Sequence, residues 1–127
     1  MSGILALDIG TKRTGLAYAQ TGQGFVMALD TLRHDSTDEL IALLRPIAKG
    51  KKVGELIVGL PRLLSGVEGK QAGLVRKTAD AIAAALRLPV TFVDERFTSG
   101  AGERGDPDAR AACAILSIVL AQREKKS

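Results

Sequence analysis

The sequence has very few of the side chains that build disulfide frameworks, zinc sites and histidine relays. It contains one cysteine, Cys113, and one histidine, His34. A single cysteine cannot form an internal disulfide, and one histidine disfavours both a His-rich zinc site and a Ser-His-Asp hydrolase. We expect His34 on the surface of a strand-to-helix turn and Cys113 in the core of a helix. Carboxylates would therefore have to carry most of any catalysis.

Aromatic residues are also scarce, because there is no tryptophan and aromatics make up 3% of the chain. This disfavours an RNA-binding sheet that stacks bases on aromatic rings. The N-terminus reaches Asp8 without a basic flank, so it does not resemble a signal peptide. The longest nearly apolar run, 111–121, is shorter than the ~20 residues that span a bilayer. These absences predict a cytoplasmic protein without membrane contact.

What the chain does contain is enough apolar sequence for one core. It has 127 residues, of which 46% are hydrophobic and 25% charged, and this predicts one domain over residues 1–127. The 18 basic and 14 acidic residues give a net charge of +4. Such a mild excess is compatible with a polyanionic partner but is common in other proteins.

Apolar runs and turn residues predict a mixed α/β fold. Three closely spaced strands over 3–8, 16–19 and 25–32 form an antiparallel meander, and two later strands follow over 55–59 and 90–93. Three helices are predicted to begin at the capping boxes Ser36–Glu39 and Ser65–Glu68 and at Pro107. Pro46 predicts a kink or an early end in the first helix. The order of three strands, helix, strand, helix, strand, helix implies a five-stranded sheet, antiparallel and then parallel through helical crossovers.

Carboxylates lie at the ends of these elements. Asp8 ends the first strand, Asp94 and Glu95 end the last strand, and Asp108 lies in the first turn of the last helix. The carboxyl ends of neighbouring strands meet at one sheet edge, so three acids could converge there. Oxygen-only ligands suit Mg²⁺ or Mn²⁺, and two such ions about 4 Å apart can activate water and stabilise the leaving oxygen of a phosphodiester.

Each of these residues also has an ordinary structural explanation. Asp8 precedes a glycine turn, where aspartate is common, and Asp108 is favoured by the dipole of its helix. The segment 94–96 could be a solvated strand end with a local ion pair. Lys12 and Arg13 could contact phosphate or simply form an exposed basic turn. Spacing alone does not choose between the two interpretations.

Five blocks in order resemble the YqgF family, also called RuvX. They are Leu-Asp-Ile-Gly-Thr-Lys-Arg-Thr-Gly at 7–15, Val-Gly-Leu-Pro at 58–61, Gly-Val-Glu-Gly-Lys-Gln at 66–71, Phe-Val-Asp-Glu-Arg at 92–96 with Thr98 and Ser99, and Asp-Ala-Arg-Ala-Ala-Cys-Ala-Ile-Leu at 108–116. The resemblance covers nearly the whole chain. It implies an RNase H-like fold related to the RuvC Holliday-junction resolvases. Family members are described as nucleases that process the 5′ end of pre-16S ribosomal RNA, with resolvase-like cleavage of branched DNA as the other proposal.

Position by position, the resemblance makes Asp8, Glu95 and Asp108 the catalytic acids and metal ligands. Strand alternation places Asp94 on the face opposite Glu95, so Asp94 ranks below it. The residues expected to border or neutralise the nucleic-acid backbone are Gly10, Thr11, Lys12, Arg13, Arg62 and Arg96. The connection 100–107 is shorter than in relatives, so contacts over the site are expected to differ, and Asp106 is the alternative acid if the register shifts.

The sequence therefore predicts a metal-dependent phosphodiesterase that uses Mg²⁺ or Mn²⁺, with water as the nucleophile. Its partner would be nucleic acid, either an RNA precursor or branched or single-stranded DNA, and backbone-directed cleavage leaves no base-reading signature to separate them. A resolvase would need a two-fold homodimer to cut two strands symmetrically, whereas RNA trimming would not. A nucleic-acid-binding assembly factor without turnover is the alternative outside enzymes. A nucleotide binder of the actin and sugar-kinase type is rejected, since that machinery needs two lobes.

Overall fold

The structure, a computed structural model, describes residues 3–22, 25–61, 69–94 and 107–126, with the side chains of 109–123 in the last range. The elements follow the predicted order: β1 (Gly3–Ile9), β2 (Arg13–Gln20), β3 (Met27–Arg33), α1 (Thr37–Gly50), β4 (Val53–Leu60), α2 (Lys70–Leu86), β5 (Val90–Asp94) and α3 (Pro107–Lys126). None of the helices in these ranges is long and apolar enough to cross a membrane.

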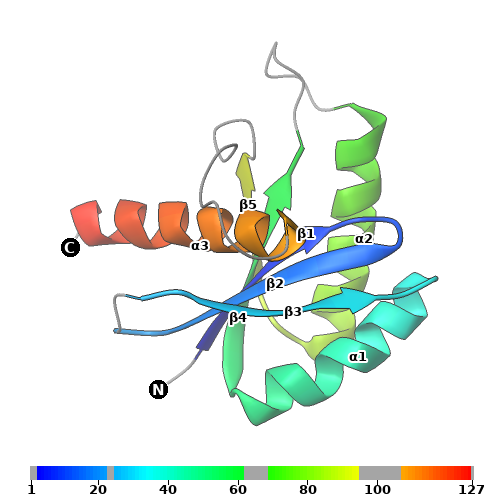
Figure 1. The fold of residues 1–127 in the computed structure, drawn as a ribbon, viewed down its shortest axis with the longest axis horizontal. Helices are drawn as coiled ribbons and strands as arrows, with labels where there is room; N and C mark the ends of the chain where they lie inside the picture. Colours follow the sequence, from blue (N-terminus) through cyan, green and yellow to red (C-terminus); the bar gives the residue numbers. More distant parts are fainter. Residues whose placement is uncertain (1–2, 23–24, 62–68, 95–106, 127) are drawn as a thin grey trace.

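The strands form one sheet in the order β3-β2-β1-β4-β5 (Figure 1). β2 pairs antiparallel with both β1 and β3, whereas β1 and β4, and then β4 and β5, pair in parallel. The predicted mixed sheet is thus confirmed. Because the last three strands of this order are parallel, the carboxyl ends of β1, β4 and β5 lie at the same edge, where ligands bind in such sheets.

Helices cover both faces of the sheet, and the alternation of β1 shows which face each helix covers. Leu5, Leu7 and Ile9 belong to a core cluster with residues of α1 and α2. Ile4 and Ala6 belong to a second cluster with residues of α3. β1 is buried on both sides because neighbouring side chains of a strand point to opposite faces. We call the two sides the α1/α2 face and the α3 face.

On the α3 face, β1 and β2 present alanine to the helix at several positions. Ala6 on β1, Ala17 and Ala19 on β2, and Ala112 on α3 are all buried in the second cluster. Such small side chains leave little distance between the backbone of the helix and the sheet. The predicted apolar stripe of the last helix is confirmed by the buried Ile115, Leu116 and Val119. Cys113 packs partly buried against the same cluster, as predicted.

Helix α1 begins as the sequence predicts and ends later. The Ser36 hydroxyl accepts a hydrogen bond from the Glu39 N–H at 3.1 Å, which confirms the first capping box. Of the two outcomes expected at Pro46, a kink or an early end, the early end is wrong, because the helix continues to Gly50. Pro46 and Ala42 lie on the exposed side, so water can hydrogen-bond the Ala42 carbonyl that proline leaves without a donor. Packing of the buried face stabilises the remaining turns.

Helix α2 begins at Lys70, with Gly69 at the N-cap position and no side-chain cap. The second predicted capping box, 65–68, lies outside the described residues. At the other end, Arg87 adopts the left-handed conformation, with φ 57° and ψ 47°, and its N–H is directed to the Ala83 carbonyl. This is a common helix ending, but glycine usually occupies the position because a Cβ is unfavourable there.

Candidate active site

The candidate active site begins with Asp8, the residue before the last of β1. Asp8 is half-buried and shares its strand parity with Ile4 and Ala6, so it lies on the α3 face. β4 and β5 end beside it at the same edge, with Leu60 and Asp94 paired in register. The expected position of Asp8, at the carboxyl edge of the central strand, is what the structure has.

Asp94 ends β5 but has the opposite parity. It is two residues from Phe92, which packs against the α1/α2 cluster, whereas the intervening Val93 packs against the α3 cluster. Strand alternation therefore places Asp94 on the face away from Asp8. Glu95, the acid that the sequence favours over Asp94, lies outside the described residues, as does Asp106.

Asp108 lies in the first turn of α3. The opposite end of this helix is attached to the sheet. There the Arg123 guanidinium donates two hydrogen bonds to the Glu55 carboxylate, one of them at 2.9 Å. Glu55 is paired with Ile4, near the start of β1. Figure 1 shows α3 beginning at the level of the β1 arrowhead, so the helix runs from the carboxyl end of β1 toward its amino end.

The lengths agree with this direction. From Arg123 to Asp108 the helix rises about 22 Å, at about 1.5 Å per residue. From Ile4 to Asp8 the strand advances about 13 Å, at about 3.3 Å per residue. The helix is therefore long enough to reach the carboxyl end of β1. It also contacts β2 and β3. The first turn of α3 thus belongs to the same end of the sheet as Asp8, although the Asp108 side chain is not among those described.

The turn that follows β1 is tight. The Gly10 N–H donates to the Arg13 carbonyl at 2.8 Å, and a Cβ on Gly10 would meet that oxygen at 2.5 Å. Glycine is thus required here by close backbone approach. Thr11, Lys12 and Arg13 are exposed, and Lys12 pairs with Asp35 at 3.3 Å. The predicted contacts Gly10 to Arg13 therefore form one surface turn beside Asp8, whereas Arg62 and Arg96 lie outside the described residues.

His34 corrects a prediction and stabilises this turn. It is not a surface residue, because only 6% of it is exposed. Its Nε2 lies 2.8 Å from the Thr14 hydroxyl, and its backbone N–H donates to the Lys12 carbonyl at 3.0 Å. Burial lowers the pKa of His34, and the nearby Lys12 adds to this effect, while Glu39 and Asp35 oppose it. The one signal in the sequence is Thr14, whose hydroxyl lies just before the apolar residues Leu16 and Ala17 of β2 and needs a partner if it is buried.

The side chains that the structure describes do not by themselves make a metal centre. Among them, no three His, Cys, Asp or Glu residues are grouped so as to hold an ion. Asp8 contributes one hard oxygen donor, and the side chains of Glu95 and Asp108, the other expected donors, are not described. Cys113 is an unsuitable ligand or nucleophile, because burial raises the pKa of its thiol.

Comparison with known proteins now decides the family. A family model described as "RuvX: Holliday junction resolvase" matches residues 2–122. The chain belongs to the RuvX family. Two relatives, each named "Putative pre-16S rRNA nuclease", come from Acaryochloris marina and Maridesulfovibrio salexigens. The first is 37% identical, over 94% of this chain and 92% of its own length, and the second is 34% identical, over 94% and 98%.

The fold of this RuvX chain is also found among solved structures. RuvC of T. thermophilus, solved in complex with a Holliday junction substrate, matches with a TM-score of 0.70 at 11% identity, over 100% of this chain and 98% of that chain. At this identity the likeness shows the fold alone. This likeness confirms the RNase H-like fold that the sequence motifs imply. The activity is indicated separately, because the family description and the names of both relatives are those of nucleases, which hydrolyse phosphodiester bonds.

Proposed function

We propose that this RuvX chain is, as a single domain, a divalent-metal-dependent nuclease whose catalytic acids are Asp8, Glu95 and Asp108. The observation that carries the proposal is the direction of α3. The Arg123–Glu55 pair holds the end of the helix at the amino edge of the sheet, so the first turn belongs to the carboxyl edge. The proposal assigns Asp8 and Asp108, which are far apart in the chain, to this one edge.

The chemistry of these residues supports the proposal. Asp8 is half-buried at the end of a central strand that is otherwise buried, so the backbone that carries its carboxylate is held in place. Three carboxylates gathered in this way repel one another unless a cation is bound, and all their donors are oxygen, which suits Mg²⁺ or Mn²⁺. Such a cation supplies positive charge toward the phosphate and makes water more acidic.

The remaining roles fall to the chain itself. Asp8, Glu95 and Asp108 position the attacking water opposite the leaving 3′ oxygen, and the products are a 5′-phosphate and a 3′-hydroxyl. The turn from Gly10 to Arg13 borders the phosphate path. Lys12 is paired with Asp35 through side chains that are 73% and 83% exposed, so it can exchange this partner for a phosphate at little cost.

For the substrate we propose pre-16S rRNA, which the names of both relatives give, and within it the 5′ region that the resemblance of the sequence motifs implies. The second candidate is a four-way DNA junction, which the family description favours. The two differ in symmetry, because resolution of a junction needs two active sites related by a two-fold axis. The assay below therefore includes both substrates.

The test compares Asp8→Asn and Asp108→Asn with Asp80→Asn, which removes an exposed acid on α2. Precursor rRNA, single-stranded DNA and a four-way junction are each incubated with Mg²⁺ or Mn²⁺. We expect both site variants to lose at least about a hundredfold in cleavage, the scale on which positioned catalytic groups act. Each should keep the stability to well within the ~1 kcal/mol of a lost helix cap. The Asp80→Asn protein should cut normally.

Three results would overturn the proposal. They are full cleavage in chelator without added metal, a site variant that cuts within a few-fold of wild type, and tight binding of nucleic acid without any turnover. The last would assign the chain to the non-catalytic assembly factors. Cleavage of the junction alone would replace the rRNA substrate by branched DNA.

A further inference from the structure

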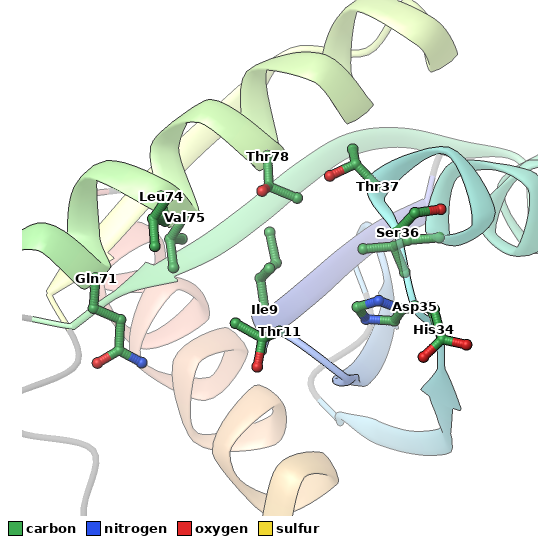
Figure 2. A pocket seen from close by; sticks show the side chains of 12 residues that line it. Ile9, Thr11, His34, Asp35, Ser36, Thr37, Gln71, Leu74, Val75 and Thr78 are labelled. Atoms are coloured by element: carbon green, nitrogen blue, oxygen red, sulfur yellow. The ribbon is translucent and has the colours of Figure 1, made fainter.

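A cavity of about 230 Å³ opens at the carboxyl end of β1, on the side of the sheet opposite Asp8. Figure 2 shows its three walls. Gln71, Leu74 and Thr78 come from α2, residues 34–36 come from the link between β3 and α1, Thr37 begins α1, and Ile9 lies between these walls. All of these walls belong to described segments of the chain. Gly10 and Thr11, in the turn after β1, also line the cavity.

The lining combines apolar walls with polar groups. Ile9, Leu40 and Val75 offer aliphatic surface, and Thr78 and Gln71 offer hydrogen-bonding groups beside it. Leu74 lines the cavity while 60% of it is exposed, so its side chain is accessible to a ligand. A flat heterocycle, apolar on its faces and polar along its edge, matches this combination, since bases bind in pockets between aromatic or apolar side chains.

A second observation is independent of the cavity's shape. His34 lines the cavity and is 94% buried, since 6% of it is exposed, yet its Nδ1 has no hydrogen-bond partner within the described part of the chain. Buried polar atoms are normally paired, and leaving one unpaired is unfavourable. The Nδ1 atom itself is shielded from solvent, so a small rotation of the His34 ring toward the cavity would bring it to a polar atom on the edge of a bound ring.

The position of the cavity ties it to the proposed active site. Ile9 follows Asp8 directly, and their Cα atoms are about 3.8 Å apart, as in any trans peptide. The two side chains point to opposite faces, so the cavity and the carboxylate share one strand end. A strand of nucleic acid that crosses this edge with a phosphate at Asp8 would bring a neighbouring nucleotide to the cavity. The acidic Asp35 on its lining disfavours phosphate there and leaves the base as the matching part.

We propose that this cavity is a subsite for one unpaired nucleobase of the strand that is cut at Asp8, an inference that rests on the proposed nuclease function. The base lies against Leu74 and Ile9 and presents a polar edge to His34. The subsite thereby fixes which phosphate of a single-stranded segment reaches the catalytic edge. Unpaired bases are the part of RNA that proteins recognise most often in this way.

Two measurements test the subsite separately from catalysis. In the first, each of the four ribonucleoside 5′-monophosphates is titrated into methyl-labelled protein and followed by NMR. We expect at least one of them to shift the methyl signals of Ile9, Leu40 and Leu74, while those of Ile57, buried on the α3 face, stay unchanged. This experiment requires no cleavage, so its outcome does not depend on the nuclease proposal.

In the second measurement, single-stranded RNA is scanned with one abasic position at a time. Wild type should lose about tenfold in affinity at one position near the cut, within the range of one base contact. Leu74→Ala should reduce this penalty to less than about twofold, on the same scale. Leu43→Ala, which truncates another exposed leucine outside the cavity, should leave the penalty intact.

Normal cleavage combined with unshifted methyl signals and a flat abasic scan would overturn the subsite and leave the nuclease proposal standing. Equal effects of Leu74→Ala and Leu43→Ala would overturn it as well. Shifted methyl signals in a protein that cuts nothing would show that the cavity binds a base, but would refute the nuclease proposal and with it the role of the cavity in choosing the phosphate that is cut.

Discussion

Removing the Arg123–Glu55 pair should measurably weaken the attachment of α3 to the sheet. The pair joins residues far apart in the chain, with two N–H groups of one guanidinium directed to the two oxygens of one carboxylate. Its side chains are 46% and 24% exposed, so water screens the attraction in part. Exposed ion pairs contribute about 0.2–1 kcal/mol, and the paired geometry places this one at the upper end, near 1 kcal/mol.

The test is a double-mutant cycle with Glu55→Gln, Arg123→Met and both together. Unfolding in urea gives the four free energies, and the coupling between the two sites should be about 1 kcal/mol, or roughly 4 °C in Tm. The cycle separates the pair from the solvation of each side chain alone. Additivity of the two single changes within about 0.3 kcal/mol would show that the pair does not hold the helix.

The coupling should also depend on pH. Hydrogen bonds from Arg123 lower the pKa of Glu55 below its ordinary value of 4.5, against the opposing effect of burial. A carboxyl with a lowered pKa in the folded state stabilises the protein fully above its unfolded pKa, and this contribution disappears as the pH falls through the folded value. The stability difference between wild type and Glu55→Gln should therefore be constant near neutral pH and shrink below about pH 4.5. A difference that persists at pH 3 would refute the assignment.

Two further changes test the packing and the backbone. Ala17→Leu adds volume at a fully buried alanine of β2 that packs under α3. It should lower the free energy of unfolding by about 1–3 kcal/mol and slow cleavage, because α3 and with it Asp108 would move away from the sheet. An unchanged Tm and rate would contradict the close approach of the helix. Arg87→Gly relieves a left-handed backbone at the end of α2 and should raise the free energy of unfolding by about 0.5–1 kcal/mol. Urea unfolding checks this, and a destabilised variant would show that the arginine side chain outweighs the strain.

The sequence predicts the local parts of this fold well. The apolar run of β1, the Ser36 cap and the stripe from Ala112 to Val119 depend on neighbouring residues, and all three are confirmed. The early end at Pro46 is wrong because packing of the buried helix face outweighs one missing hydrogen bond. The confirmed predictions depend on capping and periodicity, which act within one or two turns. The wrong one depends on packing against other elements of the fold.

The site was predictable where it depends on strand ends and not where it depends on distant partners. Asp8 lies at the expected edge because the end of a strand can be located from sequence alone. The burial of His34 depends on Thr14, twenty residues away, and the direction of α3 depends on a pair separated by 68 residues. No local pattern carries that information. The roles of all the site residues stay predictions: the catalytic and metal-binding acids Asp8, Glu95 and Asp108, and the nucleic-acid contacts Gly10, Thr11, Lys12, Arg13, Arg62 and Arg96.

The position of β1 in the middle of the sheet has a consequence for the nascent protein. The meander β1–β2–β3 uses contacts that are close in sequence, so it can form early during synthesis, with Asp8 already in place. The parallel pairing of β1 with β4, and of β4 with β5, forms only after those strands have been synthesised. The strand alanines Ala6, Ala17 and Ala19 are covered only after α3 has been synthesised as well. An unfinished chain would carry Asp8 on an uncovered face without Asp108. The proposed nuclease would therefore remain inactive until α3 has been synthesised.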